Sequence, residues 1–350
     1  MDALLHHLEH KEELSPQEVR VAAELLLDPT ATDEKKASLL EALARKGETP
    51  AEIAGFVEAF LEHAIDPHVG LLDLEGPTID VCGTGGDKLN LFNVSTTAMF
   101  VVAATGAVVL KHGNRGITSK SGGADVLETL GIRIDLPPEG FRNCLEKAGI
   151  GFLFAPAYHP AFKAVVGVRK MLAEKGIRTI FNLIGPLLNP AKPQCQLVGV
   201  FERQMCPAFA EILQQLGRES VWAVHGTTGD GRSVDEVSLL GSTRICKAGI
   251  YQDLQDEEVR PRDLGLKHAE VEDLQGGDAE VNAAILEAIL SGKDTGPKRD
   301  MVLLNAGAAI ACCGLSDDIG DGIEIARRLI DDGSALDRLR LLQDVAKRPS

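Results

Sequence analysis

Apolar side chains recur every three or four positions over residues 1–70, which is the spacing of amphipathic helices. Two stretches in this part, 15–18 and 49–52, place a hydroxyl residue, a proline and a glutamate in the order of a capping box, and apolar residues follow each at helical spacing. A third helical pattern over 37–44 ends near Gly47. No strand pattern precedes residue 78, so we predict a small all-helical domain over 1–74 and expect part of 160–190 to pack on it.

From residue 78 onward, short apolar runs alternate with helical patterns. Strands are predicted at 79–82, 107–110, 132–136, 152–154, 197–201 and 220–225. Helices are predicted at 95–105, 121–130, 138–148, 204–216, 281–290, 301–311 and 323–332, whereas 235–275 has an irregular pattern that could hold antiparallel strands. This alternation predicts an α/β domain over 75–350 with right-handed βαβ units and a mostly parallel central sheet.

Glycine- and hydroxyl-rich segments follow the first predicted strands of this domain. Residues 83–88 (GTGGDK) resemble a dinucleotide fingerprint, but Lys88 replaces its last glycine. Residues 93–97 (NVSTT) open a helix whose free N–H groups and hydroxyls can hold a phosphate, although Ser95 alone would more commonly be a helix cap. Residues 111–115 (KHGNR) and 118–123 (TSKSGG) follow the next strand. Together, these turns predict a polyphosphate site at the carboxyl ends of parallel strands.

Two further candidates lie outside this region. Asp235 and Glu236 are adjacent carboxylates that suit Mg²⁺ shared with phosphate groups, although an isolated acidic pair is more often a solvated turn. Arg169 can hold a carboxylate in a two-pronged grip, although an arginine on an amphipathic helix commonly lies at the surface. On its own, neither feature assigns a function.

Charge and composition narrow the classes of function. The 350 residues hold 36 basic and 52 acidic side chains, a formal net charge of −16, which opposes general nucleic-acid binding and attachment to an anionic membrane. Residues 88–124 nevertheless contain four basic side chains and no acidic one, which suggests a local site for a small anion. The longest apolar run, 98–110, is shorter than the roughly 20 residues of a membrane helix. Seven cysteines without a CxxC pair suggest reduced thiols, so we expect a cytoplasmic protein.

Taken in order, these segments and two more resemble the anthranilate phosphoribosyltransferase family of tryptophan biosynthesis. The resemblance covers roughly residues 10–340 and rests on GTGGD (83–87), NVST (93–96), KHGNR (111–115), SKSGGADVLETLG (119–131), FAPAYHP (154–160), RTIFNLIGPLLNPA (178–191) and the acidic pair at 235–236. It implies a small helical domain that forms a homodimer interface and a larger α/β domain of the nucleoside-phosphorylase type, with the substrates between them. Nucleoside phosphorylases share this fold, but the chain carries the phosphoribosyl motifs.

The resemblance implies a role for each matching residue. Phosphoribosyl pyrophosphate would be held by Gly83, Thr84, Gly85, Gly86, Asp87, Asn93, Ser95, Thr96, Lys111 and Ser119. Anthranilate would be bound by Gly83, Asn114 and Arg169, and its access channel would be lined by His112, Pro156, His159 and Phe162. Mg²⁺, with two ions per subunit, would be held by Ser95, Asp235 and Glu236.

The implied reaction transfers the 5-phosphoribosyl group of phosphoribosyl pyrophosphate to the amine of anthranilate and releases pyrophosphate. An aromatic amine is largely unprotonated at neutral pH, so no residue is expected to act as a general acid or base. Lys111 and Mg²⁺ would instead stabilise the charge of the leaving pyrophosphate. We expect inversion at the ribose C1 carbon and no covalent enzyme intermediate.

The chain departs from the family pattern at several positions. Lys88 and Gly116 stand where the family commonly has glycine and serine, Thr118 replaces another serine, and 172–175 and 227–234 are lengthened or diverged. Two other functions stay open at this point. One is a transferase of the same fold with another aromatic amine as acceptor. The other is a non-catalytic relative that binds nucleic acid, against which the motifs and the net charge both argue.

Overall fold

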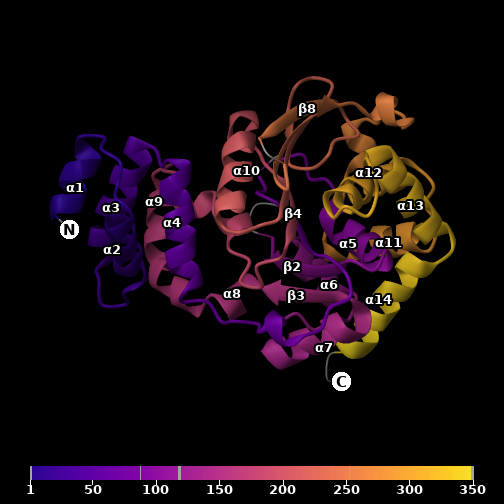
Figure 1. Ribbon diagram of the computed structural model, residues 1–350, viewed down its shortest axis with the longest axis horizontal. Helices are drawn as coiled ribbons and strands as arrows, with labels where there is room; N and C mark the ends of the chain where they lie inside the picture. Colours follow the sequence, from indigo (N-terminus) through magenta and orange to yellow (C-terminus); the bar gives the residue numbers. More distant parts are fainter. Residues whose placement is uncertain (1, 87, 117–119, 252, 348–350) are drawn as a thin grey trace.

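The computed structural model describes residues 2–86, 88–116, 120–251 and 253–347, which form a helical part and a sheet-containing part (Figure 1). The helical part begins with α1 (Asp2–Glu9), α2 (Pro16–Leu27), α3 (Asp33–Lys46) and α4 (Pro50–Leu61). A later helix, α9 (Val166–Glu174), lies among them, and its Val168 and Leu172 are buried in the same core. As predicted, no described residue before 78 belongs to a strand.

Both predicted capping boxes form. The Ser15 hydroxyl accepts a hydrogen bond from the Glu18 N–H, and the Glu18 carboxylate accepts one from the Ser15 N–H at 2.9 Å. Thr49 and Glu52 make the same reciprocal pair at the start of α4. The buried Glu52 carboxylate also pairs with Lys46 at 2.6 Å. These bonds satisfy N–H groups that the start of a helix leaves without a backbone partner.

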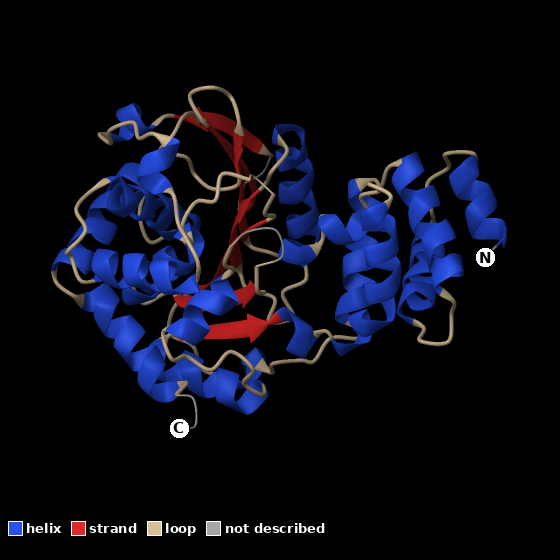
Figure 2. Ribbon diagram, turned by 180° about the vertical axis from the view of Figure 1, so that it is seen from behind, coloured by secondary structure: helices blue, strands red, loops and turns tan. Residues whose placement is uncertain are grey.

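In the described residues, the second part is built on an eight-stranded sheet with the order β3-β2-β1-β4-β5-β7-β8, in which β6 pairs with β5 (Figure 2). The parallel strands are β1 (Thr78–Gly83), β2 (Val108–Gly113), β3 (Ile150–Phe154), β4 (Cys195–Gly199) and β5 (Ser220–Thr227). The antiparallel strands are β6 (Ser233–Val234), β7 (Thr243–Gly249) and β8 (Gln255–Val259). The predicted class, a small helical domain and a large α/β domain with a mostly parallel sheet, is confirmed.

Helices cover both faces of the sheet because successive strand residues point to opposite sides. Leu197 and Val224 face the larger core, which includes α5 (Val94–Ala104), α6 (Gly123–Thr129), α7 (Pro138–Ala148), α11 (Ala279–Leu290), α12 (Pro297–Cys312), α13 (Ile319–Asp331) and α14 (Ser334–Val345). Their neighbours Val198 and Ala223 face α10 (Cys206–Gln215) and the core that continues into the helical part.

The strand predicted at 132–136 is wrong. Ile132 and Ile134 are buried alternately, as strand residues would be, but among the described residues the segment makes only one isolated bridge, between Ile132 and Lys347. The adjacent Arg133 N–H donates to the Ala346 carbonyl at 2.7 Å. The two isoleucines are therefore buried by packing against other elements, without a neighbouring strand in the sheet.

The strand order reverses its direction at β1 and β4, near the middle of the sheet. From β1 the chain continues to β2 and β3 on one side, whereas β4 and β5 lie on the other side of β1. Ligands of open α/β sheets bind beyond the carboxyl ends of the strands where the order reverses in this way. Gly83 at the end of β1 and Gly199 at the end of β4 mark that point. No described helix is both long and apolar enough to cross a membrane.

Candidate active site

The turn after β1 lies against the acidic pair, which is 150 residues further along the chain. The Gly85 N–H donates to Asp235 Oδ2 at 2.6 Å. A Cβ atom on Gly83 would come within 2.4 Å of the same oxygen, and a Cβ on Gly199 would come within 1.6 Å of the Asp235 carbonyl. Both strand ends must therefore be glycine for residue 235 to pass this closely.

The 83–88 turn needs left-handed backbone at several positions. Gly85 and Gly86 have φ of 73° and 99°. Lys88 has φ of 58°, a conformation that favours glycine and that fits the family's glycine at this position. The turn is tied to β4 because the Thr84 N–H donates to the Gly199 carbonyl at 2.9 Å. Asp87, expected to bind the pyrophosphate, lies outside the described residues.

Helix α5 begins beside this turn. Asn93, not Ser95, is its N-cap residue, and the Asn93 side chain is occupied elsewhere. Its Oδ1 accepts from Asn282 Nδ2 at 2.8 Å, and its Nδ2 donates to the Ser121 carbonyl at 3.3 Å. The reading of Ser95 as a simple helix cap is therefore wrong. The first turn of α5 presents the Ser95 and Thr96 hydroxyls together with the N–H groups that suit an anion.

Lys111 lies at the centre of the predicted phosphate site. Its side chain is buried, and Nζ donates to the Val81 carbonyl at 2.5 Å and to Ser95 Oγ at 3.3 Å. The lysine therefore joins β1, β2 and the start of α5. A Cβ on Gly123 would come within 2.8 Å of Thr96 Oγ1, so the start of α6 approaches the same place.

A buried polar group that sequence reasoning missed supports this edge of the sheet. Asp80 is fully buried on β1, and its carboxylate accepts from the His112 N–H at 3.3 Å and from Asn189 Nδ2 at 2.9 Å. Asn189 Nδ2 also donates to the Leu110 carbonyl at 2.7 Å. Burial raises the pKa of the Asp80 carboxyl, while the nearby Lys111 ammonium lowers it. An aspartate inside an apolar strand was the available signal.

Three of the four predicted channel residues, His112, His159 and Phe162, form an aromatic group on the side of the helical part. The His112 and His159 rings are edge to face at 5.3 Å, and His159 stacks on Phe162 at 5.2 Å. Burial lowers the pKa of His112 to about 3 and that of His159 to about 4, so both rings are neutral at pH 7. His159 Nε2 bonds to the Leu188 carbonyl at 2.9 Å. Pro156 lies nearby in sequence, in the short helix α8 (Ala155–Tyr158).

Arg169 projects from α9, which packs on α3 in the helical part. Its guanidinium lies over the Phe181 ring, 5.3 Å from the ring centre, and burial lowers its pKa. Among the described residues, no carboxylate forms an ion pair with it. A half-buried arginine with an aromatic support and no internal counterion is suited to an external carboxylate.

The loop after β2 is held by an acidic residue of α6. Asp125 Oδ2 accepts from the Gly116 N–H at 2.9 Å and the Gly122 N–H at 2.8 Å, and Arg115 pairs with both Asp125 and Glu128. Asn114 is exposed, and its Oδ1 accepts from the Arg115 N–H at 2.8 Å. Ser119 and Thr118 lie outside the described residues.

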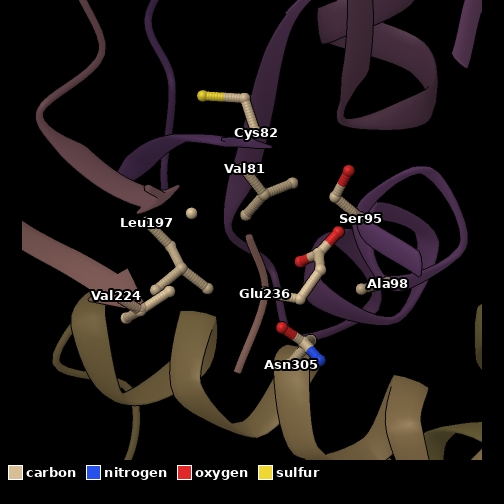
Figure 3. A pocket seen from close by; sticks show the side chains of 9 residues that line it. Val81, Cys82, Ser95, Ala98, Leu197, Val224, Glu236 and Asn305 are labelled. Atoms are coloured by element: carbon tan, nitrogen blue, oxygen red, sulfur yellow. The ribbon is translucent and has the colours of Figure 1, made fainter. Parts of the chain in front are cut away.

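Oxygen donors for a metal gather between α5 and the acidic pair. Glu236 and Ser95 line one small cavity, together with Cys82 and Asn305, and Figure 3 shows the glutamate and serine side chains next to each other. Asp235 is held at the adjoining turn. No group of three His, Cys, Asp or Glu residues within the described ranges could hold a metal alone. Few carboxylates beside a phosphate site fit Mg²⁺, which shares its coordination with substrate phosphates.

The two segments predicted to be lengthened or diverged lie outside these contacts. Residues 172–175 fall at the end of α9. Residues 227–234 turn the chain from β5 into β6, where Gly226 pairs with Val234. The Thr228 hydroxyl in this turn is hydrogen-bonded to the Asp230 carboxylate and accepts from the Arg232 N–H at 2.9 Å. The turn is thus closed on itself just before the acidic pair.

Comparisons with known proteins agree with this geometry. Residues 75–336 match the family described as glycosyl transferase family, a/b domain, and residues 2–64 match its helical bundle domain. The anthranilate phosphoribosyltransferase of Haloferax volcanii is 44% identical over 92% of this chain and 93% of its own length, and that of Herpetosiphon aurantiacus is 43% identical over 95% and 94%.

Solved structures of such enzymes superpose over nearly the whole chain. The Thermus thermophilus enzyme has a TM-score of 0.86 and 37% identity, covering 98% of this chain and 99% of that one. The Saccharomyces cerevisiae enzyme in complex with PRPP and Mg has a TM-score of 0.84 and 29% identity, covering 99% and 98%. The same yeast enzyme was also solved with 4-fluoroanthranilate, at a TM-score of 0.83 and 27% identity over 99% and 98%.

Proposed function

This chain belongs to the anthranilate phosphoribosyltransferase family, and from this we infer that it transfers the 5-phosphoribosyl group from phosphoribosyl pyrophosphate to the amine of anthranilate. The transfer releases pyrophosphate and is a step of tryptophan biosynthesis. One observation carries this conclusion most directly: the glycine turn at 83–86, the start of α5, Lys111 and the acidic pair converge at the switch point of the sheet. Relatives bind PRPP with Mg and a fluorinated anthranilate.

We propose that the pyrophosphate lies against the residues of the predicted phosphate site. The first turn of α5 has N–H groups that suit an anion, and Lys111 supplies a buried positive charge beside Ser95. Asn93 connects the start of α5 to the 120–123 loop, so these two sides of the site are held in a fixed relative position. Asp87 and Ser119 are assigned to the same site by the resemblance alone.

Anthranilate is proposed to approach from the side of the helical part. Arg169 would take the carboxylate, Asn114 and Gly83 would lie at the inner end, and His112, Pro156, His159 and Phe162 would line the path. The ring of Phe162 supports this assignment, because it is partly exposed, stacks on the neutral His159 ring and can pack against an aromatic acid. Neither imidazole is charged at neutral pH, so neither is expected to donate a proton to the leaving group.

The reaction uses Mg²⁺, and we propose two ions per subunit held by Ser95, Asp235 and Glu236 with the substrate's phosphates. When bound, Mg²⁺ neutralises charge on the departing pyrophosphate. The chain's own residues do the rest: Lys111 adds fixed positive charge, and the two parts of the molecule place the acceptor amine opposite the leaving group and exclude water. The amine needs no base before it attacks because it is already unprotonated, and the proton that the nitrogen loses once the C–N bond has formed goes to the released pyrophosphate or to water.

A homodimer formed through the helical part and a cytoplasmic location are further proposals. Val21 and Val166, which are exposed apolar residues of α2 and α9, support an interface there. All seven cysteines are free thiols, which supports a reducing compartment. Light scattering should give twice the 37.3 kDa chain mass if the dimer forms, and a single-chain mass would refute it.

The decisive experiment is the loss of anthranilate fluorescence on mixing the purified protein with phosphoribosyl pyrophosphate and Mg²⁺, with EDTA as the control. Metal-dependent loss that matches the pyrophosphate released is the expected result. The double variant Asp235→Asn, Glu236→Gln should show no such loss. If the wild-type protein binds phosphoribosyl pyrophosphate but leaves anthranilate unchanged, another aromatic amine is the acceptor.

A further inference from the structure

Asn305 is the one polar side chain in the buried middle of α12, a helix in which every described residue from 301 to 312 is buried. It is 2% exposed and lies next to the cavity lined by Glu236 and Ser95 (Figure 3). A carboxamide in such a place costs stability unless its hydrogen-bonding groups are satisfied. Its partners therefore show what it is for.

Within the described residues, the hydrogen bonds of the Asn305 side chain all go to backbone groups. Its Oδ1 accepts from the Val237 N–H at 2.9 Å, and its Nδ2 donates to the Val237 carbonyl at 2.9 Å. The second hydrogen of Nδ2 goes to the Met301 carbonyl, one turn back in the same helix, at 2.9 Å. The carboxamide is therefore hydrogen-bonded to both the N–H and the carbonyl of Val237, in the way that a neighbouring β-strand would be.

Val237 immediately follows the acidic pair, in a segment that belongs to no strand. Strand β6 ends at Val234, and residues 235–240 are irregular. The Ser238 N–H is fixed by the Thr243 hydroxyl at 2.8 Å, and Asp235 is fixed by its passage over Gly199. Glu236 lies between these two points, where its carbonyl passes close to Gly226 and its peptide bond joins it to Val237. Val237 is itself 1% exposed and bonded to Asn305.

We propose that Asn305 is a positioning residue that directs the Glu236 carboxylate toward Ser95, so that the Mg²⁺ complex of phosphoribosyl pyrophosphate is bound in the correct geometry. The inference rests on the proposed function, because it assigns Asn305 to the support of that metal site. Mg²⁺ demands near-ideal octahedral geometry at about 2.0–2.1 Å, so a small rotation of the Val237 peptide would misplace a ligand. Residues that orient metal ligands typically change metal affinity by about 10–100-fold when they are replaced.

The test compares Asn305→Leu with Leu303→Ala. Asn305→Leu keeps the number and branching of the side-chain heavy atoms, although leucine is bulkier, and it removes every side-chain hydrogen bond to Val237. Leu303→Ala empties a fully buried position of the same helix, and its side chain has no polar group with which to hold the acidic segment, so it serves as the matched destabilised control. Asn305→Ser is a smaller replacement for the case in which the leucine variant does not fold.

Calorimetry without anthranilate measures the affinity for phosphoribosyl pyrophosphate in Mg²⁺ and in EDTA, and the ratio of the two gives the gain that Mg²⁺ confers. This gain should shrink about 10–100-fold in Asn305→Leu and Asn305→Ser, while affinity in EDTA stays near that of the wild type. In steady-state kinetics, the Mg²⁺ activation constant should rise with an unchanged anthranilate KM. Leu303→Ala should unfold more easily but retain the full gain.

The outcomes separate the inference from the function on which it rests. A wild-type protein that gains no affinity from Mg²⁺ would overturn both. A wild-type gain that is unchanged in the Asn305 variants would overturn the positioning role alone and leave Asn305 as a structural residue of α12. An equal loss of the gain in Leu303→Ala would also overturn it, because general loosening of the helix would then be sufficient.

Discussion

Arg169 and the imidazoles near it are polar groups held in a largely apolar, aromatic setting. Phe181 lies under the guanidinium and also stacks on Phe60 of α4 at 5.5 Å. The arginine is therefore oriented by the packing of the helical part, whereas the proposed pyrophosphate site lies at the edge of the sheet. Apart from Gly83, the residues proposed for the two substrates differ, so the two affinities should be separable by mutation.

Arg169→Ala should raise the anthranilate KM by at least about tenfold, because a charge-assisted bond to a carboxylate contributes roughly 1.5–3 kcal/mol. Binding of phosphoribosyl pyrophosphate should be nearly unchanged. Steady-state kinetics with each substrate varied in turn measures both effects. Arg178→Ala removes an exposed arginine that pairs with Glu202 and should change neither constant. Equal loss of both affinities in Arg169→Ala would refute the assignment.

His159 gives a prediction about pH. Its pKa is about 4 in the folded protein and 6.5 in an ordinary setting, so between these values the unfolded chain binds a proton that the folded chain does not. Stability should therefore fall as pH drops from 6.5 toward 4 and should gain nothing from this group above 6.5. His159→Phe should remove roughly 1–2 kcal/mol of the difference in unfolding free energy between about pH 7.5 and about pH 5.

Urea unfolding at the two pH values measures this difference, and the exposed His63→Gln serves as the control variant. An unchanged pH dependence in His159→Phe would mean that the ring is already protonated or already exposed.

The buried groups Asp80, Asn189 and Asn305 could not be assigned from the sequence, because each acts through contacts with residues far away along the chain. The glycine turns and Lys111 could be proposed as site residues in advance because they stand in long motifs, whereas Arg169 and the acidic pair could be proposed only through the family resemblance.

At the scale of elements, the helices with explicit start signals were the most predictable. The capping boxes at Ser15 and Thr49 identify α2 and α4, and the helix predicted at 138–148 has the observed bounds of α7. The predicted strand at 132–136 failed because burial alternates there without a strand partner. Helix α14 was not predicted. It begins directly after Gly333, at φ of 84°, and its burial depends on contacts with α5 and α7 that no local pattern reports.

Replacing Thr49 by alanine tests the contribution of a cap. The change removes the acceptor for the Glu52 N–H at the start of α4 and should lower the unfolding free energy by about 0.5–2 kcal/mol. Ser38→Ala, at an exposed position inside α3 where the hydroxyl only bonds back to the Glu34 carbonyl, should change it by less than about 0.5 kcal/mol. Equal effects of the two variants in chemical denaturation would show that the cap bond contributes nothing specific.

At the scale of the whole molecule, the helical part reaches the site through α9. Lys36 of α3 is 1% exposed, and its Nζ donates to the Ala164 carbonyl at 2.6 Å, just before α9 begins. A Cβ on Gly167 would come within 2.5 Å of Asp33 Oδ2, so the two helices meet closely at this point. The position of Arg169 is thus set by a contact with a residue far earlier in the chain.

Lys36→Met should keep the apolar stem and lose the bond to Ala164. We expect a several-fold higher anthranilate KM and little change in the KM for phosphoribosyl pyrophosphate, because α9 would be held less firmly while the sheet is untouched. Lys35→Met, at the exposed neighbouring position, is the matched control. A change confined to the melting temperature, with both KM values intact, would show that Lys36 only stabilises the helical part.

The placement of α9 has a consequence for how the protein can be divided. The chain leaves the helical part after α4, builds the first three strands, returns to supply α9, and then goes back to form β4. A fragment of residues 1–74 would expose to water the surface of α3 that α9 covers. The two parts are therefore not interchangeable modules, and a chimera that swaps the N-terminal helices between enzymes must exchange the 160–190 stretch with them.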